Sequence, residues 1–363
     1  MLTTTAASAG GLDRSGQGVG VIFEDGNVAQ LSYGLVAPSV SGTATGTGLG
    51  GVSSGNMAGD YNQFGLGLKY DVNENVSVAL IFDQPFGADV DYGEAETGYY
   101  TGPATADVDS SALTALVRYK IDSNFSVHGG LRYQTVSAAV SKPTAAGYSI
   151  DSEESSATGF LAGIAYERPE IALRVALTYN SKIDHDITAT ESCPGAGPAA
   201  ALCTTAITPV STPESINLDF QTGIAADTLL FGSIRHAKWT QFDFAPPGHA
   251  AIGLGSLQSY DNDTTAYSLG IGRRFNETWS GAVTVGFEDS TGGFAGNLAP
   301  TDGNTSLGLG ATYTGDGFKI TGGLRYIWLG DADTEHPAIP GAVGSEFRDN
   351  TAIAGGLSVV YSF

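Results

Sequence analysis

Charged side chains are scarce in this 363-residue chain and make up only 15% of it, against roughly 25% in an average soluble protein. Basic residues are fewest: 16 Lys and Arg stand against 38 Asp and Glu, for a net charge of −22. Without clustered cations the chain cannot neutralise phosphates, which argues against nucleic acid as a partner. Long apolar runs are also missing, since no stretch approaches the roughly 18 residues of a membrane-spanning helix. A helical membrane protein is therefore excluded.

Cysteine is nearly absent. Cys193 and Cys203 lie close together in the Gly- and Pro-rich segment CPGAGPAAALC, which predicts one local disulfide and an oxidising compartment. Because no His lies nearby to complete four zinc ligands, we expect no metal site. The Gly-rich stretches lack the strand–P-loop–helix context of a nucleotide site, so we also expect no cofactor.

Glycine and aromatic residues are plentiful: Gly supplies 51 residues and the aromatics 10%, at a mean hydropathy of +0.01. The apolar residues are spread by alternation. In SINLDFQTGIAADTLLFGSIRHAKWTQFDF (residues 215–244) they recur at about every second position on both sides of a tight turn at Ala226–Thr228. Alternation bounded by turn residues predicts a long antiparallel hairpin.

This unit repeats along the chain and predicts about 14 strands, an even number as in single-chain bacterial barrels. Short turns alternate with long, acidic, Gly- and Pro-rich loops, which is typical of the periplasmic and extracellular ends of an outer-membrane barrel. We therefore predict an all-β fold, a transmembrane antiparallel β-barrel over residues 27–363. The expected strands are 27–40, 60–71, 75–85, 107–121, 125–141, 155–166, 171–190, 214–225, 228–244, 260–275, 278–291, 303–313, 317–333 and 348–363.

Lipid must meet the apolar face of each strand, so the polar positions point into the lumen. An Arg in mid-membrane lipid would cost roughly 2–4 kcal/mol, which supports this choice. The arginines predicted to point inward are Arg118, Arg132, Arg174, Arg235 and Arg325. Their candidate counter-charges are Asp13, Glu24, Asp25, Asp83 and Glu288. Either these arginines hold the N-terminal segment inside the barrel by charge-assisted hydrogen bonds, or one or two bind a substrate carboxylate; both can be true of different arginines.

The first 26 residues precede the first predicted strand. Residues 1–9 end in the small residues Ala7, Ser8 and Ala9, similar to the end of a secretory signal whose charged and apolar parts are missing. We interpret residues 1–9 as the residual end of a signal peptide, with an ordinary flexible terminus as the alternative. Residues 10–26 have no clean period and must either hang in the periplasm or fold into the lumen.

The ends and loops point to the Gram-negative outer membrane, with both termini periplasmic. The last strand ends on the aromatic Phe363, a pattern that resembles the recognition signal of the barrel-assembly machinery, which we expect as a partner during biogenesis. Outer-membrane lipid and lipopolysaccharide are the expected surroundings. Acidic clusters such as the one at 89–96 are interpreted as solvated loops, with a site for calcium or lipopolysaccharide-associated cations as the alternative.

Three segments carry a resemblance to a known family. They are VSVALIFDQPFGADVDYG (76–93), TPESINLDFQTGIAADTLLFGSIRHAKWTQF (212–242) and DTTAYSLGIGRRFNETWSGAVTVGFEDS (263–290). Their order and spacing resemble the FadL/TodX-type outer-membrane transporters of long-chain fatty acids and other hydrophobic compounds. The resemblance spans nearly the whole chain, although the family's usual Asn-Pro-Ala motif is not visible at its start.

The resemblance implies a monomeric 14-stranded barrel closed by an N-terminal hatch, whose third strand is kinked inward to open a lateral gap. Hydrophobic ligand would be captured outside and leave sideways into the membrane. On this chain the hatch is residues 10–26. Its charged residues are Asp13, Arg14, Glu24 and Asp25, and the kink and lateral exit lie at Asp83, Gln84, Pro85, Phe86 and Gly87. Pro cannot donate to a ladder and Gly weakens it, which predicts broken pairing here; an ordinary strand end is the alternative.

Two other functions are compatible with a barrel. A general polar-solute porin predicts a wide polar lumen without a plug. A lipid-acting outer-membrane enzyme needs catalytic groups, and the candidate is Asp184-His185-Asp186. At period two His185 faces away from both acids, so one face cannot carry all three. We therefore expect no catalytic residues.

Overall fold

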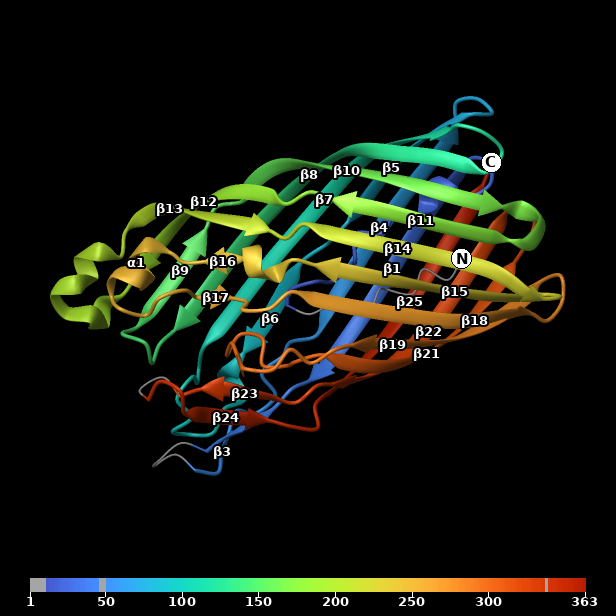
Figure 1. The fold of residues 1–363 in the computed structure, drawn as a ribbon. Helices are drawn as coiled ribbons and strands as arrows, with labels where there is room; N and C mark the ends of the chain where they lie inside the picture. The colour runs from blue at the N-terminus through green and yellow to red at the C-terminus, as the bar shows by residue number, and fades with distance from the viewer. Residues whose placement is uncertain (1–10, 46–49, 337–338) are drawn as a thin grey trace.

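The computed structural model describes residues 11–45, 50–336 and 339–363. Fourteen long antiparallel strands within these ranges close into a barrel (Figure 1), because β1 (Val28–Ser39) pairs with both β4 (Tyr61–Asp71) and the last strand, β25 (Thr351–Ser362). The predicted all-β barrel is confirmed. The strands between are β5 (Val76–Asp83), β7 (Thr105–Lys120), β8 (Phe125–Lys142), β10 (Ser155–Arg168), β11 (Leu173–Asn180), β14 (Ser215–Ala225), β15 (Thr228–Ala237), β18 (Thr264–Arg274), β19 (Trp279–Glu288), β21 (Asn304–Thr314) and β22 (Phe318–Leu329).

The alternation of the sequence decides which side chains face out. On β7, Leu113 and Val117 are 43% and 50% exposed, whereas Arg118 is 5% exposed. Outward aromatic pairs mark both ends of the apolar band, Trp279 with Tyr313 near the short turns and Tyr326 with Trp328 toward the long loops. Such girdles flank the apolar band of outer-membrane barrels. Among the described residues, no helix has the length and apolar character to cross a membrane.

The two ends of the barrel differ, as the loop lengths predict. Figure 1 shows short turns and the C-terminus at one end, while α1, β9, β13 and β23 crowd the other. The β14–β15 turn is tight because Asp227 adopts a left-handed backbone (φ 56°), a conformation that Asp tolerates better than most residues. Phe363 lies at this end, where its N–H donates to the carbonyl of Asn27. The described chain begins inside the barrel with Gly11, so the expected periplasmic N-terminus and the signal-peptide end at 1–9 lie outside the described residues.

The long loops fold into sheets above the barrel. β8 continues past the wall and pairs with β9 (Tyr148–Ser152), which leads to β12 (Ile183–Ser192) and β13 (Thr205–Thr212). A second sheet joins β20 (Phe294–Ala295), β23 (Ala332–Glu335), β24 (Val343–Phe347), β2 (Gly42–Ala44) and β3 (Val52–Ser53). The shorter elements are η1 (Gly20–Phe23), β6 (Gly87–Asp91), η2 (Tyr92–Glu94), η3 (Pro169–Ile171), η4 (Pro194–Leu202), η5 (Trp239–Gln241), β16 (Asp243–Phe244), α1 (Pro247–Ala251) and β17 (Gln258–Ser259).

Three predicted strands run past the point where the chain leaves the barrel wall. Residues 171–190 form two strands. In the barrel wall β11 pairs with β14, up to Asn180 with Ser215, whereas β12 leaves the wall and pairs with β9 and β13. Residues 228–244 stop pairing at Ala237, since Trp239 turns inward to become fully buried. Residues 317–333 stop at Leu329 for a similar reason: β23 turns away into the second outer sheet. The alternation of apolar and polar residues continues through all three breaks, so the pairing between distant strands sets where each strand ends.

One outer loop is held by a buried polar cluster. The predicted disulfide between Cys193 and Cys203 closes the β12–β13 loop. The Glu191 carboxylate accepts the backbone N–H groups of Gly248 and His249, both at 2.7 Å, and the Tyr148 hydroxyl at 2.9 Å. Burial lowers the pKa of His249, whose Nε2 lies 3.4 Å from the Lys142 ammonium. The α1 loop is thereby fixed to β12.

Candidate functional site: a filled lumen with a gap in its wall

The wall is interrupted between β4 and the strands β5 and β6. β4 begins at Tyr61 and pairs with β1 along its length, but its other edge pairs with β5 only from Leu66 onward. Residues 61–65 therefore have no strand partner on that side. Pairing resumes beyond β4 in the isolated bridge between Ala58 and Val90. We call the unpaired stretch between these contacts the gap.

The gap arises from the segment Gln84-Pro85-Phe86. β5 pairs with β7 as far as Asp83–Ala112, and β6 resumes with Gly87–Asp109, so three residues face two on β7. Pro85 has no N–H for the ladder, and the Phe86 N–H binds the Ser110 hydroxyl at 2.8 Å instead. Strand pairing is thus interrupted at the five residues predicted for the kink, which lie beside the unpaired edge of β4.

Two side chains span the gap. The Gln84 amide oxygen accepts the Phe64 N–H at 2.8 Å, in the place of a missing strand partner. From inside, the Arg14 guanidinium lies 4.2 Å from the centre of the Tyr61 ring on β4. It also covers Gly87, where any Cβ would overlap the guanidinium carbon. A side chain at position 87 would therefore displace the Arg14 guanidinium.

The N-terminal segment (residues 11–26) lies in the lumen and is bonded to the kink. The Arg14 N–H donates to the Pro85 carbonyl at 2.8 Å, and the Gly87 N–H donates to the Leu12 carbonyl at 2.9 Å. The Ser15 hydroxyl donates to Asp83 at 2.5 Å. A short stretch of antiparallel pairing thus replaces part of the contact that β4 does not make.

The same segment is fixed to the opposite wall. Asp13 and Arg235 form a buried ion pair at 2.5 Å, and the Asn217 amide donates to the Gly16 carbonyl at 2.8 Å. Further along, Phe23 receives the guanidinium groups of Arg118 and Arg174 on its ring, at 4.7 and 4.9 Å from the centroid. These contacts hold the segment at both ends.

The five inward arginines therefore differ in what they contact. Arg118, Arg174 and Arg235 contact the N-terminal segment, and Arg132 binds Thr114 and Asn180 in the adjoining wall network. Arg325 lies on the other side of the lumen. Contact with the N-terminal segment therefore applies to Arg118, Arg174 and Arg235, and binding of a ligand by an arginine stays a prediction.

Some of the predicted counter-charges have other neighbours. Asp83 accepts the Ser15 hydroxyl and lies within electrostatic reach of Arg132, Glu24 lies 3.9 Å from Lys319 and within electrostatic reach of Arg174, and Asp25 is exposed. Arg118 pairs instead with Glu167 on β10. Sequence reasoning missed Glu167, and also Tyr61 and Trp239 as neighbours of the N-terminal segment. Alternation reports the face of a strand but not which side chains share a level in the barrel.

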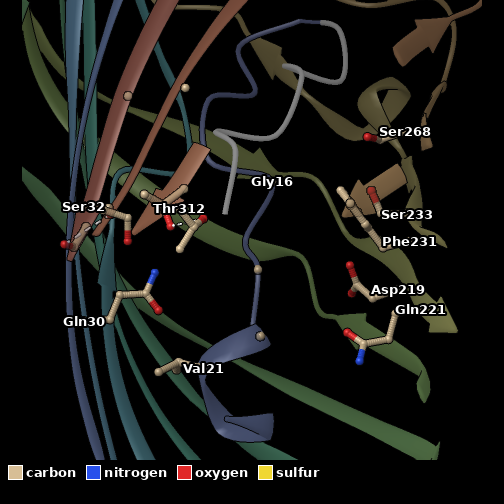
Figure 2. A pocket seen from close by; sticks show the side chains of 18 of the residues that line it. Gly16, Val21, Gln30, Ser32, Asp219, Gln221, Phe231, Ser233, Ser268 and Thr312 are labelled. Carbon is tan, nitrogen blue, oxygen red and sulfur yellow. Dashed lines mark hydrogen bonds between the residues drawn. The ribbon is translucent and has the colours of Figure 1, made fainter. Parts of the chain in front are cut away.

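A cavity of about 860 Å³ lies beside the N-terminal segment. It reaches from the gap, at Phe64, Gly65 and Gln84, toward the short-turn end, at Asp227 and Arg274. Figure 2 shows the segment crossing the lumen between two walls. One wall presents Gln30, Ser32 and Thr312, and the other Asp219, Gln221, Phe231, Ser233 and Ser268.

Small inward residues open this side of the lumen. Cross-strand partners form one continuous row, running Gly272, Ala282, Gly310, Gly323, Gly356 and Gly34. The row begins near the short turns and ends at Gly34, which pairs with Gln63 on the strand that borders the gap. Since these positions carry at most a methyl group, the cavity follows a smooth wall toward the gap.

Fold, apolar band and obstructed lumen together define an outer-membrane channel of the Gram-negative cell envelope. A profile of the family described as outer membrane protein transport protein (OMPP1/FadL/TodX) matches residues 37–363, and the chain belongs to this family. Its members are transport channels for hydrophobic compounds rather than enzymes. None of the curated proteins matches the chain by sequence.

Solved structures support the same fold. A Pseudomonas aeruginosa FadL homologue aligns with a TM-score of 0.77 at 15% identity, over 99% of this chain and 96% of its own. The toluene transporter TodX of P. putida gives 0.64 at 13% identity, over 95% and 92%. The Ralstonia pickettii toluene transporter TbuX gives 0.62 at 14% identity, over 94% and 91%. At such identities the similarity concerns the fold alone.

Proposed function

We propose that this channel takes up long-chain fatty acids or other hydrophobic small molecules passively and releases them sideways through the gap between β4 and β5–β6. The observation that carries the proposal is the interrupted strand pairing beside a cavity that shares Phe64, Gly65 and Gln84 with it. No energy source is needed, because transfer of apolar surface from water into lipid is itself favourable, at roughly 25 cal/mol per Å².

The outer surface next to the gap suits such a release. Tyr33, Leu35 and Phe64 are outward-facing and 43–52% exposed, so a molecule that leaves between β4 and β6 meets an apolar surface in the bilayer. An aqueous pore would give it no comparable gain. The exit thus connects one apolar environment with another.

The N-terminal segment acts in this proposal as the hatch, and residues 83–87 as the lateral exit. The hydrogen bonds of the N-terminal segment to Pro85 and Gly87 link any movement of the hatch to the kink. Hatch contacts across the lumen favour this function over a general polar porin, which needs a wide polar bore. For the cargo, the fold is shared with a FadL homologue and with transporters named for toluene, so both acids and hydrocarbons are candidates.

The remaining partners are proposed on similar grounds. The terminal Phe363 is 64% exposed beside Tyr361 at the short-turn end, where barrel-assembly machinery can reach it. β1 pairs with both β4 and β25, so the barrel closes without a strand from a second chain, which favours a monomer. The outer sheets rise from the loop end, on the side expected to face lipopolysaccharide.

The experiment replaces Gly65, an inward residue on the gap edge, with Trp. Gly65→Trp fills the inner side of the gap, and Leu68→Trp on the lipid face of the same strand is the matched control. Cells that lack their own hydrophobic uptake channels are given labelled oleate or toluene, and folding is checked by heat-modifiable gel mobility. We expect Gly65→Trp to slow uptake severely and Leu68→Trp to leave it unchanged.

Two results would count against the proposal. Normal uptake by a folded Gly65→Trp channel would remove the gap from the route. Swelling of wild-type proteoliposomes in sugars would favour the polar porin instead.

A further inference from the structure

Trp239 lies where three separate parts of the chain meet. Its indole packs edge-on against Phe86 of the kink, with 5.7 Å between the ring centroids and an interplanar angle of 82°. Phe242 and Tyr260, from the segment between β15 and β18, complete the cluster at centroid distances of 5.9 and 5.1 Å from Trp239. Rings in edge-to-face contact attract one another beyond the gain from burial alone. Because Trp239 is fully buried, its whole ring takes part in these contacts.

The N-terminal segment contacts the same ring. Gly11 has a positive φ of 59°, and a Cβ at this position would come within 2.9 Å of two indole carbons of Trp239. Leu12 belongs to the same buried cluster, and its carbonyl accepts the Gly87 N–H. A side chain at position 11 would therefore displace the indole. Trp239 thus supports both the N-terminal segment and the kink.

The backbone of Phe86 is held by one hydroxyl in place of a ladder. Its N–H donates to the Ser110 Oγ at 2.8 Å, and its carbonyl accepts from the same hydroxyl at 2.6 Å. It also forms an isolated bridge with Asp13 of the N-terminal segment. The ring of Phe86 is 3% exposed and packs against Trp239. Since regular strand pairing is interrupted here, the ring contact contributes a large share of what fixes this residue.

The ring cluster lies on the long-loop side of the cavity. Trp239 follows the outer end of β15, and Tyr260 precedes the outer end of β18. The cavity instead runs from the gap toward the short turns, and its described lining includes none of the four rings. Phe242 packs against this cluster and also against the buried core of the outer loops, which contains Tyr92 and Phe347. A molecule that enters from the long-loop end therefore meets the rings before it meets the cavity.

We propose that Trp239 is a positioning residue of the uptake route. It holds the kink through Phe86 and the N-terminal segment through Gly11, and cargo that enters from the long-loop end displaces its ring. This role rests on the proposed lateral release and adds to it a control at the outer side. An apolar cargo suits the step, because it replaces the ring contacts that the indole gives up, whereas a polar solute does not.

The first test asks whether cargo reaches Trp239, with bromobenzene as a contact quencher of indole fluorescence. The chain has three Trp, and the other two, Trp279 and Trp328, are 48% exposed on the lipid face. Replacing both by Phe leaves Trp239 as the single indole of the full chain in nanodiscs. The matched control keeps only Trp279, which reports bromobenzene dissolved in the bilayer. We expect saturable quenching of Trp239 and quenching of Trp279 in proportion to the amount in the bilayer. An unquenched Trp239 at concentrations that quench Trp279 would overturn the proposal.

The second test asks whether Trp239 holds the kink. Trp239→Leu removes the ring, and Trp328→Leu is the matched control, because Trp328 packs edge-on against Tyr326 on the lipid face at 4.9 Å. Amides of residues 84–88 should exchange roughly 2- to 10-fold faster in Trp239→Leu, the range for loss of one ring pair. Toluene uptake by the cells described above should quicken by a similar factor. The control should change neither.

A second variant guards against misfolding at position 239 and tests the path of the effect. If Trp239 acts through Phe86, then Phe86→Leu should have the same effect, and the double variant should be no faster than either single one. Additive effects, or unchanged or slower exchange and uptake in folded Trp239→Leu, would overturn the role of Trp239 while the proposed uptake stands. Absence of toluene uptake by the wild type would instead refute the uptake itself.

Discussion

Loss of the Asp13 charge should release the N-terminal segment from the lumen. Asp13→Asn leaves Arg235 buried without its carboxylate, and breaking a buried ion pair typically costs about 3–5 kcal/mol. Arg235 keeps acceptors on Ser215 (2.8 Å), Asn217 (2.9 Å) and Gln17 (3.3 Å), so the lower end, about 3 kcal/mol, applies. At 1.4 kcal/mol per factor of ten, the released state becomes roughly 100-fold more populated.

Hydrogen exchange followed by mass spectrometry measures this population directly. Amides of residues 11–26 should exchange roughly 100-fold faster in Asp13→Asn, while barrel strands, held by their ladders, should not change. Adding Arg235→Gln should recover part of the loss, since no unpaired charge then stays buried. Lys182→Gln is the control, because its ion pair with Asp184 is about half exposed and contributes little. Wild-type exchange in Asp13→Asn would refute the anchoring role of this pair.

Three further predictions concern the gap, the lipid face and the outer loop. Arg14→Ala removes a cation–π contact with Tyr61 of roughly 0.5–2 kcal/mol and should raise the uptake rate severalfold; slower uptake would show that Arg14 guides ligand rather than closes the gap. Leu324→Arg places a charge on an outward residue that is 68% exposed and should cost roughly 2–4 kcal/mol in folding titrations into vesicles; an unchanged midpoint would contradict the assigned orientation. Because burial lowers the pKa of His249, the α1 loop should be fully stable above the unfolded histidine pKa of about 6.5 and lose stability as the pH falls through the lower folded value; protease nicking that did not increase in acid would contradict this.

The sequence predicts the barrel and its inward arginines well, because both depend on local alternation. The kink is equally local, since a Pro in a strand interrupts the ladder wherever it lies. Alternation does not give the height of each side chain along the barrel axis. The pairing of Arg118 with Glu167 depends on strand register, and the choice of Asp13 for Arg235 depends on the path of a segment without any period.

Strand ends were the other source of error, for a related reason. Residues 181–192 keep a strand pattern yet leave the wall, and Trp239 ends a strand by packing against Phe86 and Tyr260. Both outcomes follow from contacts between distant segments.

The unequal division of the arginines has a consequence for how such a channel can change. Substitutions on strands β7 to β15 must be matched by substitutions in residues 11–26, because these two parts of the chain hold each other. The wall from β19 to β22 carries less of this obligation, its contribution being the ion pair of Lys319 with Glu24. New cargo preferences can therefore be acquired there, by evolution or by an engineer, one residue at a time and without loosening the N-terminal segment.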